Sequence, residues 1–324
     1  MKKFSFKLKI MSSDNENISK QDYAITLLLL LLSGSVLLSA SCGCMANDKE
    51  PSLHQPVIAC TIPPQEEFIK EVAGDYPVKI LVMVPPGSSP HTFEPTPSQI
   101  AGLESADIYI ALGSGIEFEN RWISRITQTY PGLRVVNLSE NINFCSRAGS
   151  IKDIAVTSGD DTGAGCDPHM WLSLKNAAII VNTTAEELAV LRPDMKENFF
   201  ENRDNYNQRL ADADRKIRKS LEDLKTRTVL VYHPAFGYFC RDYNLTQMAV
   251  EEDGREPSSR QLADLIIKAR SEGINIVFTE PEGSTRQAET LARELNGTMV
   301  LISPLAENYL ENMQQIAEKI SGIP

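Results

Sequence analysis

Histidine is scarce in this sequence of 324 residues: it occurs only at His54, His91, His169 and His233. None of the six cysteines has the CxxC spacing of a cysteine-based zinc site, and no HExxH motif of a zinc protease occurs. Basic residues are also few, with 32 Lys and Arg against 43 Asp and Glu and a formal net charge of −11. This balance argues against nucleic-acid binding, which requires a basic surface.

Long apolar runs are lacking after the N-terminus, which argues against a channel or a permease. The first 44 residues have the order of a signal peptide, with a basic start, an apolar run and small residues before Cys42. Cysteine after small residues indicates lipidation at Cys42, with Cys44 as a second candidate. An uncleaved membrane helix over residues 24–44 and free secretion are the alternatives.

Residues 45–56 are polar and are expected to form a linker between the N-terminal segment and the fold. We therefore expect the folded part to be extracytoplasmic and anchored to the outer face of the cell membrane. In that oxidising compartment, Cys60, Cys145, Cys166 and Cys240 could form one or two disulfides. A pair between Cys145 and Cys166 would close a loop rich in Gly, Ser and Asp.

Short β-rich runs alternate with segments of helical spacing, first over residues 57–172 and again over 227–324. The expected strands are 57–61, 78–84, 107–112, 133–138, 228–232, 274–279 and 299–302. The expected helices are 64–73, 97–105, 117–129, 258–272, 286–295 and 307–320. This alternation predicts an α/β protein of two lobes with mostly parallel sheets.

Residues 173–226 are expected to join the two lobes as a long, rigid helical segment. Ser173 is a suitable cap for a helix over 174–191, Pro193 interrupts it, and helical spacing continues over 194–224 with a single narrow apolar stripe. The preceding segment, 143–167, is predicted to be an irregular loop.

Three of the four histidines are each directly adjacent to a proline in the sequence. His91 follows the strand 78–84, His169 directly precedes the connecting helix, and His233 follows the strand 228–232. Ligands bind at the carboxyl ends of parallel strands, and proline stiffens the adjacent loop. We therefore expect the three imidazoles to meet in a cleft between the lobes and to bind a metal ion.

The fourth ligand is expected to be Glu280, which ends the strand 274–279. Glu282, Ser284 and a water molecule are alternatives. Three imidazoles and one oxygen suit tetrahedral Zn²⁺, although imidazole also binds copper, iron and nickel.

The segments around these histidines resemble those of the metal-binding subunits of zinc/manganese ABC importers, the TroA-like cluster A-I family. They are Pro-His-Thr-Phe-Glu-Pro-Thr-Pro at 90–97, Asp-Pro-His-Met-Trp-Leu-Ser at 167–173 and Tyr-His-Pro-Ala-Phe-Gly-Tyr at 232–238. The resemblance extends over residues 56–322 and implies two α/β lobes joined by a long helix.

The resemblance also implies that His91, His169 and His233 are metal ligands and that the protein is not an enzyme. Many members that favour manganese have a carboxylate at the third position, so His233 favours Zn²⁺ over Mn²⁺. The loop 143–167 lacks the histidines that many zinc-specific members carry there. The expected partners are an ABC permease, its ATPase and the membrane, with the chain itself a monomer. A zinc hydrolase is the alternative of another class, because three histidines and an open position can also be catalytic.

Overall fold

The computed structural model describes residues 55–144, 166–251, 255–283 and 285–322. The expected signal peptide or anchor, most of the linker, Cys145 and Ser284 lie outside these residues. Among the residues described, no helix is both long enough and apolar enough to span a membrane.

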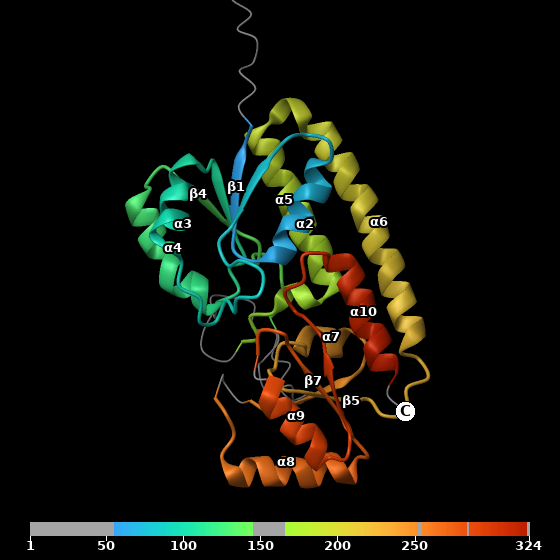
Figure 1. Cartoon of the computed structure of the whole chain (residues 1–324). Helices are drawn as coiled ribbons and strands as arrows, with labels where there is room; N and C mark the ends of the chain where they lie inside the picture. The colour runs from blue at the N-terminus through green and yellow to red at the C-terminus, as the bar shows by residue number, and fades with distance from the viewer. Residues whose placement is uncertain (1–54, 145–165, 252–254, 284, 323–324) are drawn as a thin grey trace, which may run out of the picture. The chain divides into compact units, whose positions relative to one another are not determined.

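The first sheet contains four parallel strands in the order β2-β1-β3-β4 (Figure 1). They are β1 (Val57–Cys60), β2 (Lys79–Val82), β3 (Ile108–Ala111) and β4 (Arg134–Asn137). The helices between them are α2 (Pro63–Ala73), α3 (Pro97–Gly102) and α4 (Glu117–Thr129). Ile58 pairs with Ile80 and Ile108 on the neighbouring strands. The central strands β1 and β3 are buried throughout, as expected of a parallel sheet covered on both faces.

The second sheet repeats this topology in the order β6-β5-β7-β8, again with all strands parallel. Its strands are β5 (Thr228–Val231), β6 (Thr246–Ala249), β7 (Ile276–Thr279) and β8 (Thr298–Leu301). Its helices are α7 (Gly237–Asp242), α8 (Ser259–Ser271), α9 (Thr285–Glu294) and α10 (Tyr309–Ser321). The two predicted α/β lobes with parallel sheets are therefore confirmed.

Two elements of the second lobe were not predicted, namely β6 and α7. Strand β6 reads Thr-Gln-Met-Ala and lies at the edge of its sheet, so its hydrophobic signal is weak. Helix α7 has only six residues and follows a Pro-Ala-Phe turn, which is too short for a helical period to be recognised.

The connecting segment consists of two packed helices rather than one continuous helix. Helix α5 (Leu174–Leu191) begins at Ser173, whose side chain accepts a hydrogen bond from Asn176 N. The 3₁₀ turn Pro193–Met195 separates it from α6 (Lys196–Ser220). The buried stripe of α6 consists of Phe199, Tyr206, Leu210, Ala213 and Ile217.

A layer of helices ties the lobes together, because α6 packs against α5 and α2 from the first half and against α10 from the second (Figure 1). Glu67 of α2 accepts hydrogen bonds from the Tyr206 hydroxyl of α6 (2.5 Å) and from Leu310 N of α10 (3.2 Å). Carboxylate hydrogen bonds of this kind are the stronger ones in proteins, so Glu67 joins three helices at one point.

The segment that carries His169 is held by Trp171, which is fully buried. Its indole Nε1 donates to the carbonyl of Pro304 (2.7 Å), and its own carbonyl accepts from the Tyr309 hydroxyl (2.7 Å). Since Pro304 and Tyr309 belong to the second lobe, Trp171 anchors the segment around His169 to that lobe.

Two of the cysteines considered for disulfides are buried thiols, Cys60 in β1 and Cys240 in α7. Burial raises the pKa of the Cys240 thiol to about 12, which keeps it protonated and unreactive. The pair between Cys145 and Cys166 stays a prediction, because Cys145 lies outside the described residues.

Replacing Gly297 by alanine should destabilise the fold, because the new Cβ would collide with the backbone carbonyl of Asn275. Overpacking of this kind costs about 1–3 kcal/mol. Gly102 in α3 is the matched control, since a Cβ there meets nothing within 4 Å. Chemical denaturation should give a lower midpoint for Gly297→Ala and an unchanged or higher one for Gly102→Ala. Equal midpoints for the two variants would contradict the close approach at Gly297.

Candidate metal centre

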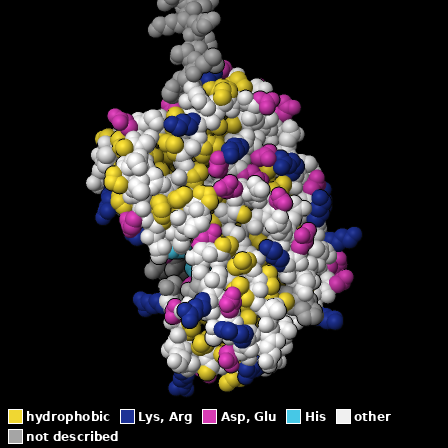
Figure 2. Space-filling model, in the orientation of Figure 1, with side chains coloured by type: hydrophobic (Ala, Val, Ile, Leu, Met, Phe, Trp, Pro, Cys, Tyr) yellow, Lys and Arg dark blue, Asp and Glu magenta, His cyan; other side chains and the backbone are white. Residues whose placement is uncertain are grey.

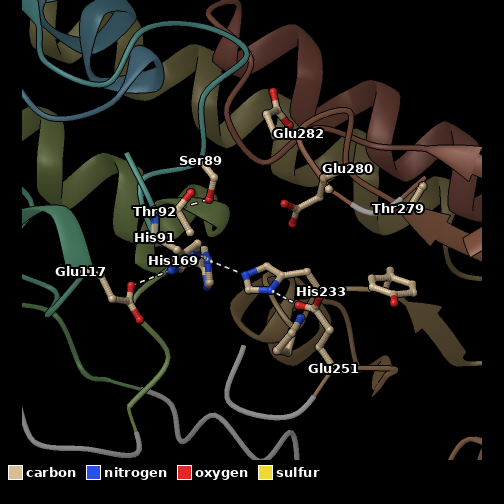
Figure 3. Close-up of a pocket in the computed structure, with 13 residues that line it drawn as sticks. Ser89, His91, Thr92, Glu117, His169, His233, Glu251, Thr279, Glu280 and Glu282 are labelled. Carbon is tan, nitrogen blue, oxygen red and sulfur yellow. Dashed lines mark hydrogen bonds and ion pairs between the residues drawn. The ribbon is translucent and has the colours of Figure 1, made fainter. Parts of the chain in front are cut away.

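The three histidines line one cavity of about 530 Å³ (Figure 3). His91 lies in the loop between β2 and α3, and His233 comes two residues after the end of β5. His169 directly precedes the 3₁₀ turn Met170–Leu172, between the lobes. Glu280 follows the last residue of β7 and lines the same cavity. The cavity therefore brings the expected side chains together, with His233 and Glu280 at strand ends and His91 and His169 in connecting segments.

The Nε2 atoms of the three histidines converge. His169 Nε2 lies 3.1 Å from His91 Nε2 and 3.4 Å from His233 Nε2. One ring nitrogen of each histidine belongs to a group whose members all lie within 4.8 Å of one another. Two nitrogens bound to tetrahedral zinc at about 2.0–2.1 Å would lie roughly 3.3–3.4 Å apart. The two distances from His169 Nε2 are therefore close to those of ligands on one tetrahedral ion.

The other ring nitrogen of each histidine meets a carboxylate. Nδ1 of His91 donates to Glu117 (2.6 Å), that of His169 to Asp167 (2.8 Å) and that of His233 to Glu251 (3.0 Å). A deprotonated carboxylate can only accept, so each Nδ1 carries the proton. In the neutral ring, Nε2 then has a lone pair, and three lone pairs face one another across a short gap. A cation satisfies this arrangement, and the carboxylates make the rings more basic ligands.

His169 is the most buried ligand candidate, with 4% of its surface exposed. Asp167 accepts from both its backbone N (2.9 Å) and its ring, and the carbonyl of Asp167 accepts from the buried Tyr238 hydroxyl (3.0 Å). A Cβ added at Gly237 would lie 2.5 Å from the Asp167 carboxylate, so glycine is required there for close approach.

Glu280 points toward the histidines in Figure 3, and its Oε1 is buried without a hydrogen-bond partner among the described residues. Burial raises its pKa to about 7, and the nearby Glu282 and Glu251 add to this rise while His233 opposes it. A buried, unpaired carboxyl oxygen beside three imidazoles is the chemistry of a further ligand. The group of ligand atoms within 4.8 Å of one another includes the three histidine nitrogens but not the Glu280 oxygens.

Of the alternatives to Glu280, Glu282 lines the cavity but lies farther from the histidines in Figure 3. Ser284 lies outside the described residues. Glu280 is therefore the carboxylate with the better placement.

The carboxylates that orient the rings were not identified from the sequence. Asp167 could have been, since it lies two residues before His169. Glu117 begins α4, after β3, and Glu251 follows β6, the edge strand that was not predicted. A prediction of β6 would have placed Glu251 at the same edge as His233 and Glu280.

Comparison with known proteins identifies the class. The profile of the family described as "Zinc-uptake complex component A periplasmic" matches residues 58–322. The zinc-binding protein AdcA of Streptococcus pyogenes serotype M1 is 27% identical over 261 residues, which cover 76% of this chain and 50% of AdcA. The high-affinity zinc uptake system protein ZnuA of Bacillus subtilis is 27% identical over 286 residues, with 86% and 88% covered.

Solved structures agree with this fold. A crystal structure of a ZnuA deletion mutant with zinc bound superposes with a TM-score of 0.74 at 32% identity, covering 82% of this chain and 97% of that one. A manganese-bound periplasmic metal-binding protein of Candidatus Liberibacter asiaticus, at 19% identity and a TM-score of 0.69, shares the fold.

The chain has the two-lobed α/β fold of these periplasmic metal-binding proteins, and it belongs to the family described as "Zinc-uptake complex component A periplasmic". It spans about half the length of the AdcA relatives that it matches.

The carboxylate contacts predict that all three rings carry their proton on Nδ1 in chelator-treated protein at pH 8. Long-range ¹H–¹⁵N NMR of the imidazoles distinguishes the two neutral forms. In a Glu251→Ala variant, His233 should become a mixture of the two forms, while His91 and His169 keep theirs. An Nε2–H form at all three histidines in the unaltered protein would contradict the arrangement.

Proposed function

We propose that this protein captures a divalent transition-metal ion, Zn²⁺ in preference to Mn²⁺, outside the cytoplasm and delivers it to an ABC importer. The ligands are His91, His169 and His233, with Glu280 as the fourth. The observation that carries the proposal is the convergence of three imidazoles, with His169 Nε2 3.1 and 3.4 Å from the other two Nε2 atoms and a carboxylate on the opposite nitrogen of each ring.

The ligand types support zinc. Imidazole nitrogens bind Zn²⁺ more tightly than Mn²⁺, which prefers carboxylate and water oxygens. A tetrahedral set of three nitrogens and one oxygen is a common zinc arrangement, whereas Mn²⁺ favours octahedral oxygen ligands. The relatives named for zinc binding and zinc uptake support the same choice.

The cavity also supports a free metal ion as cargo. Its lining includes the carboxylates Glu117, Glu251, Glu280 and Glu282 and contains no Lys or Arg among the residues described. A negative cavity attracts a cation and repels an anionic metal chelate. Delivery to a permease and its ATPase, and attachment to the outer face of the membrane, rest on the family and on the sequence of residues 1–44.

Removing any of the three histidines should abolish stoichiometric zinc binding. The fragment from residue 51, wild type beside His91→Ala, His169→Ala and His233→Ala, should be measured by metal content and by competition with a zinc chelator. We expect one Zn²⁺ per wild-type chain and weaker zinc binding in each variant. Loss of a residue that only hydrogen-bonds to a ligand typically lowers metal affinity roughly 10–100-fold, and loss of a ligand itself should lower it more.

His54 lies outside the described residues and serves as the matched control, since His54→Ala in the same fragment should bind zinc as the wild type does. Wild-type protein that binds no stoichiometric metal, or histidine variants that bind it normally, would refute the proposed site. Preference for Mn²⁺ in the same competition would contradict zinc as the cargo.

Zinc affinity should fall as the pH falls, because protons compete with the metal for the imidazoles and for Glu280. With a pKa of about 7, Glu280 is largely protonated below that pH in the metal-free protein, and the ion must displace its proton. Glu280→Gln removes this proton, so we expect weaker binding at pH 8 and a shallower pH dependence between about pH 6 and 8.

The measurement is the zinc dissociation constant from pH 5.5 to 8.5 for wild type and Glu280→Gln, with Glu282→Gln as the control. If Glu280→Gln and wild type have the same affinity and the same slope, Glu280 is not the fourth ligand. If Glu282→Gln reproduces the change expected of Glu280→Gln, Glu282 takes that position.

A further inference from the structure

His91 is the ligand candidate least supported by regular secondary structure. It lies nine residues beyond the end of β2, in a segment without a helix or strand before α3. His233, by contrast, comes two residues after the central strand β5, and Tyr232 N donates to the carbonyl of Phe278 on β7 (2.7 Å). His169 is buried. Within its segment, His91 N donates to Ser89 Oγ (3.3 Å), and the remaining contacts that hold the residue come from another element.

Helix α4 supplies these contacts from its first two turns. Phe118 N donates to the carbonyl of Pro90 (3.0 Å), and the Glu117 carboxylate holds the His91 ring. The third contact comes from Arg121, one turn further on, whose Nη2 donates to the His91 carbonyl (2.6 Å).

Arg121 also makes two further contacts. Its Nη1 donates to the Glu94 carboxylate (2.8 Å) and its Nε to the carbonyl of Glu117 (3.2 Å). One planar guanidinium thus joins the backbone of His91, the segment three residues further on and the backbone of the residue that orients the His91 ring. Arginine suits this role because its donors have a fixed fork geometry that lysine lacks.

The stability of the fold does not explain this arrangement. The side chains of Arg121 and Glu94 are 39% and 59% exposed, and exposed ion pairs contribute little to folding. One of the contacts of Arg121 is with the backbone carbonyl of His91, a residue that lines the cavity.

We infer that Arg121 is a positioning residue that holds His91 in its metal-binding place from the protein surface; this inference rests on the proposed function of the cavity. Loss of Arg121 leaves the histidine present but removes the hydrogen bond to its backbone carbonyl. The ion then leaves faster, because one of its ligands is no longer fixed.

The test compares Arg121→Ala and Arg121→Lys with Arg125→Ala. Arg125 is the matched control, because it is exposed on the same helix and its guanidinium lies over the Trp122 ring, 5.1 Å from the centroid, away from His91. Zinc dissociation is followed by mixing the loaded protein with excess chelator. We expect zinc to dissociate about tenfold faster from Arg121→Ala, within the range of effects seen when a residue that supports a metal ligand is removed. Arg121→Lys should not restore the rate, and Arg125→Ala should equal wild type.

Imidazole ¹⁵N NMR of the metal-free protein separates positioning from a general loss of structure. In Arg121→Ala the His91 ring resonances should change while those of His169 and His233 stay, and the thermal midpoint should equal that of Arg125→Ala. Unchanged His91 resonances with an unchanged dissociation rate would overturn the inference, and so would equal changes at all three histidines. If the wild type bound no stoichiometric zinc, the proposed function would fail, whereas the NMR comparison would still report on the contact between Arg121 and His91.

Discussion

The structure of the cavity depends on one constraint, which is that three imidazoles present their lone pairs to one another. A carboxylate accepts from Nδ1 of each ring, so in the neutral ring the lone pair lies on Nε2 and faces the other two histidines. In the neutral state the three acceptors repel one another, and the surrounding carboxylates add negative charge. Folding therefore builds a site whose strain a cation relieves, and any ion that binds there stabilises the folded state by mass action.

This constraint requires that the two lobes be held in a fixed relation, since His91 comes from one lobe and His233 from the other. The helix layer supplies it: Glu67 of α2 accepts hydrogen bonds from α6 and α10, and Trp171 is tied to the second half of the chain through Pro304. Figure 2 shows histidine surface in the hollow between the lobes on this face. With ligand atoms 3.1 and 3.4 Å apart, a shift of the lobes by one ångström would disrupt the set.

The sequence allowed prediction of the lobes, because apolar strands alternate with helices in both halves, and of the three histidines, because each lies in a short proline-containing segment. The strand-end argument itself applies to His233 and Glu280, whereas His91 lies well beyond β2. The sequence did not allow prediction of what orients the rings. Glu251 follows the weakly apolar edge strand β6, and Tyr238, which holds Asp167, lies on the short helix α7. Contacts of this kind depend on packing between distant elements, which periodicity along one segment does not encode.

The three imidazole–carboxylate pairs differ in how much water surrounds them, so the three histidines are not equivalent. The side chain of Asp167 is 2% exposed, that of Glu251 19% and that of Glu117 38%. Electrostatic coupling weakens as water surrounds a pair, so water screens the contact of His169 with Asp167 least and that of His91 with Glu117 most. The exposed contacts of α4 with the His91 segment thus lie beside the most solvated of the three pairs, whereas the pair of His169 and Asp167 is buried.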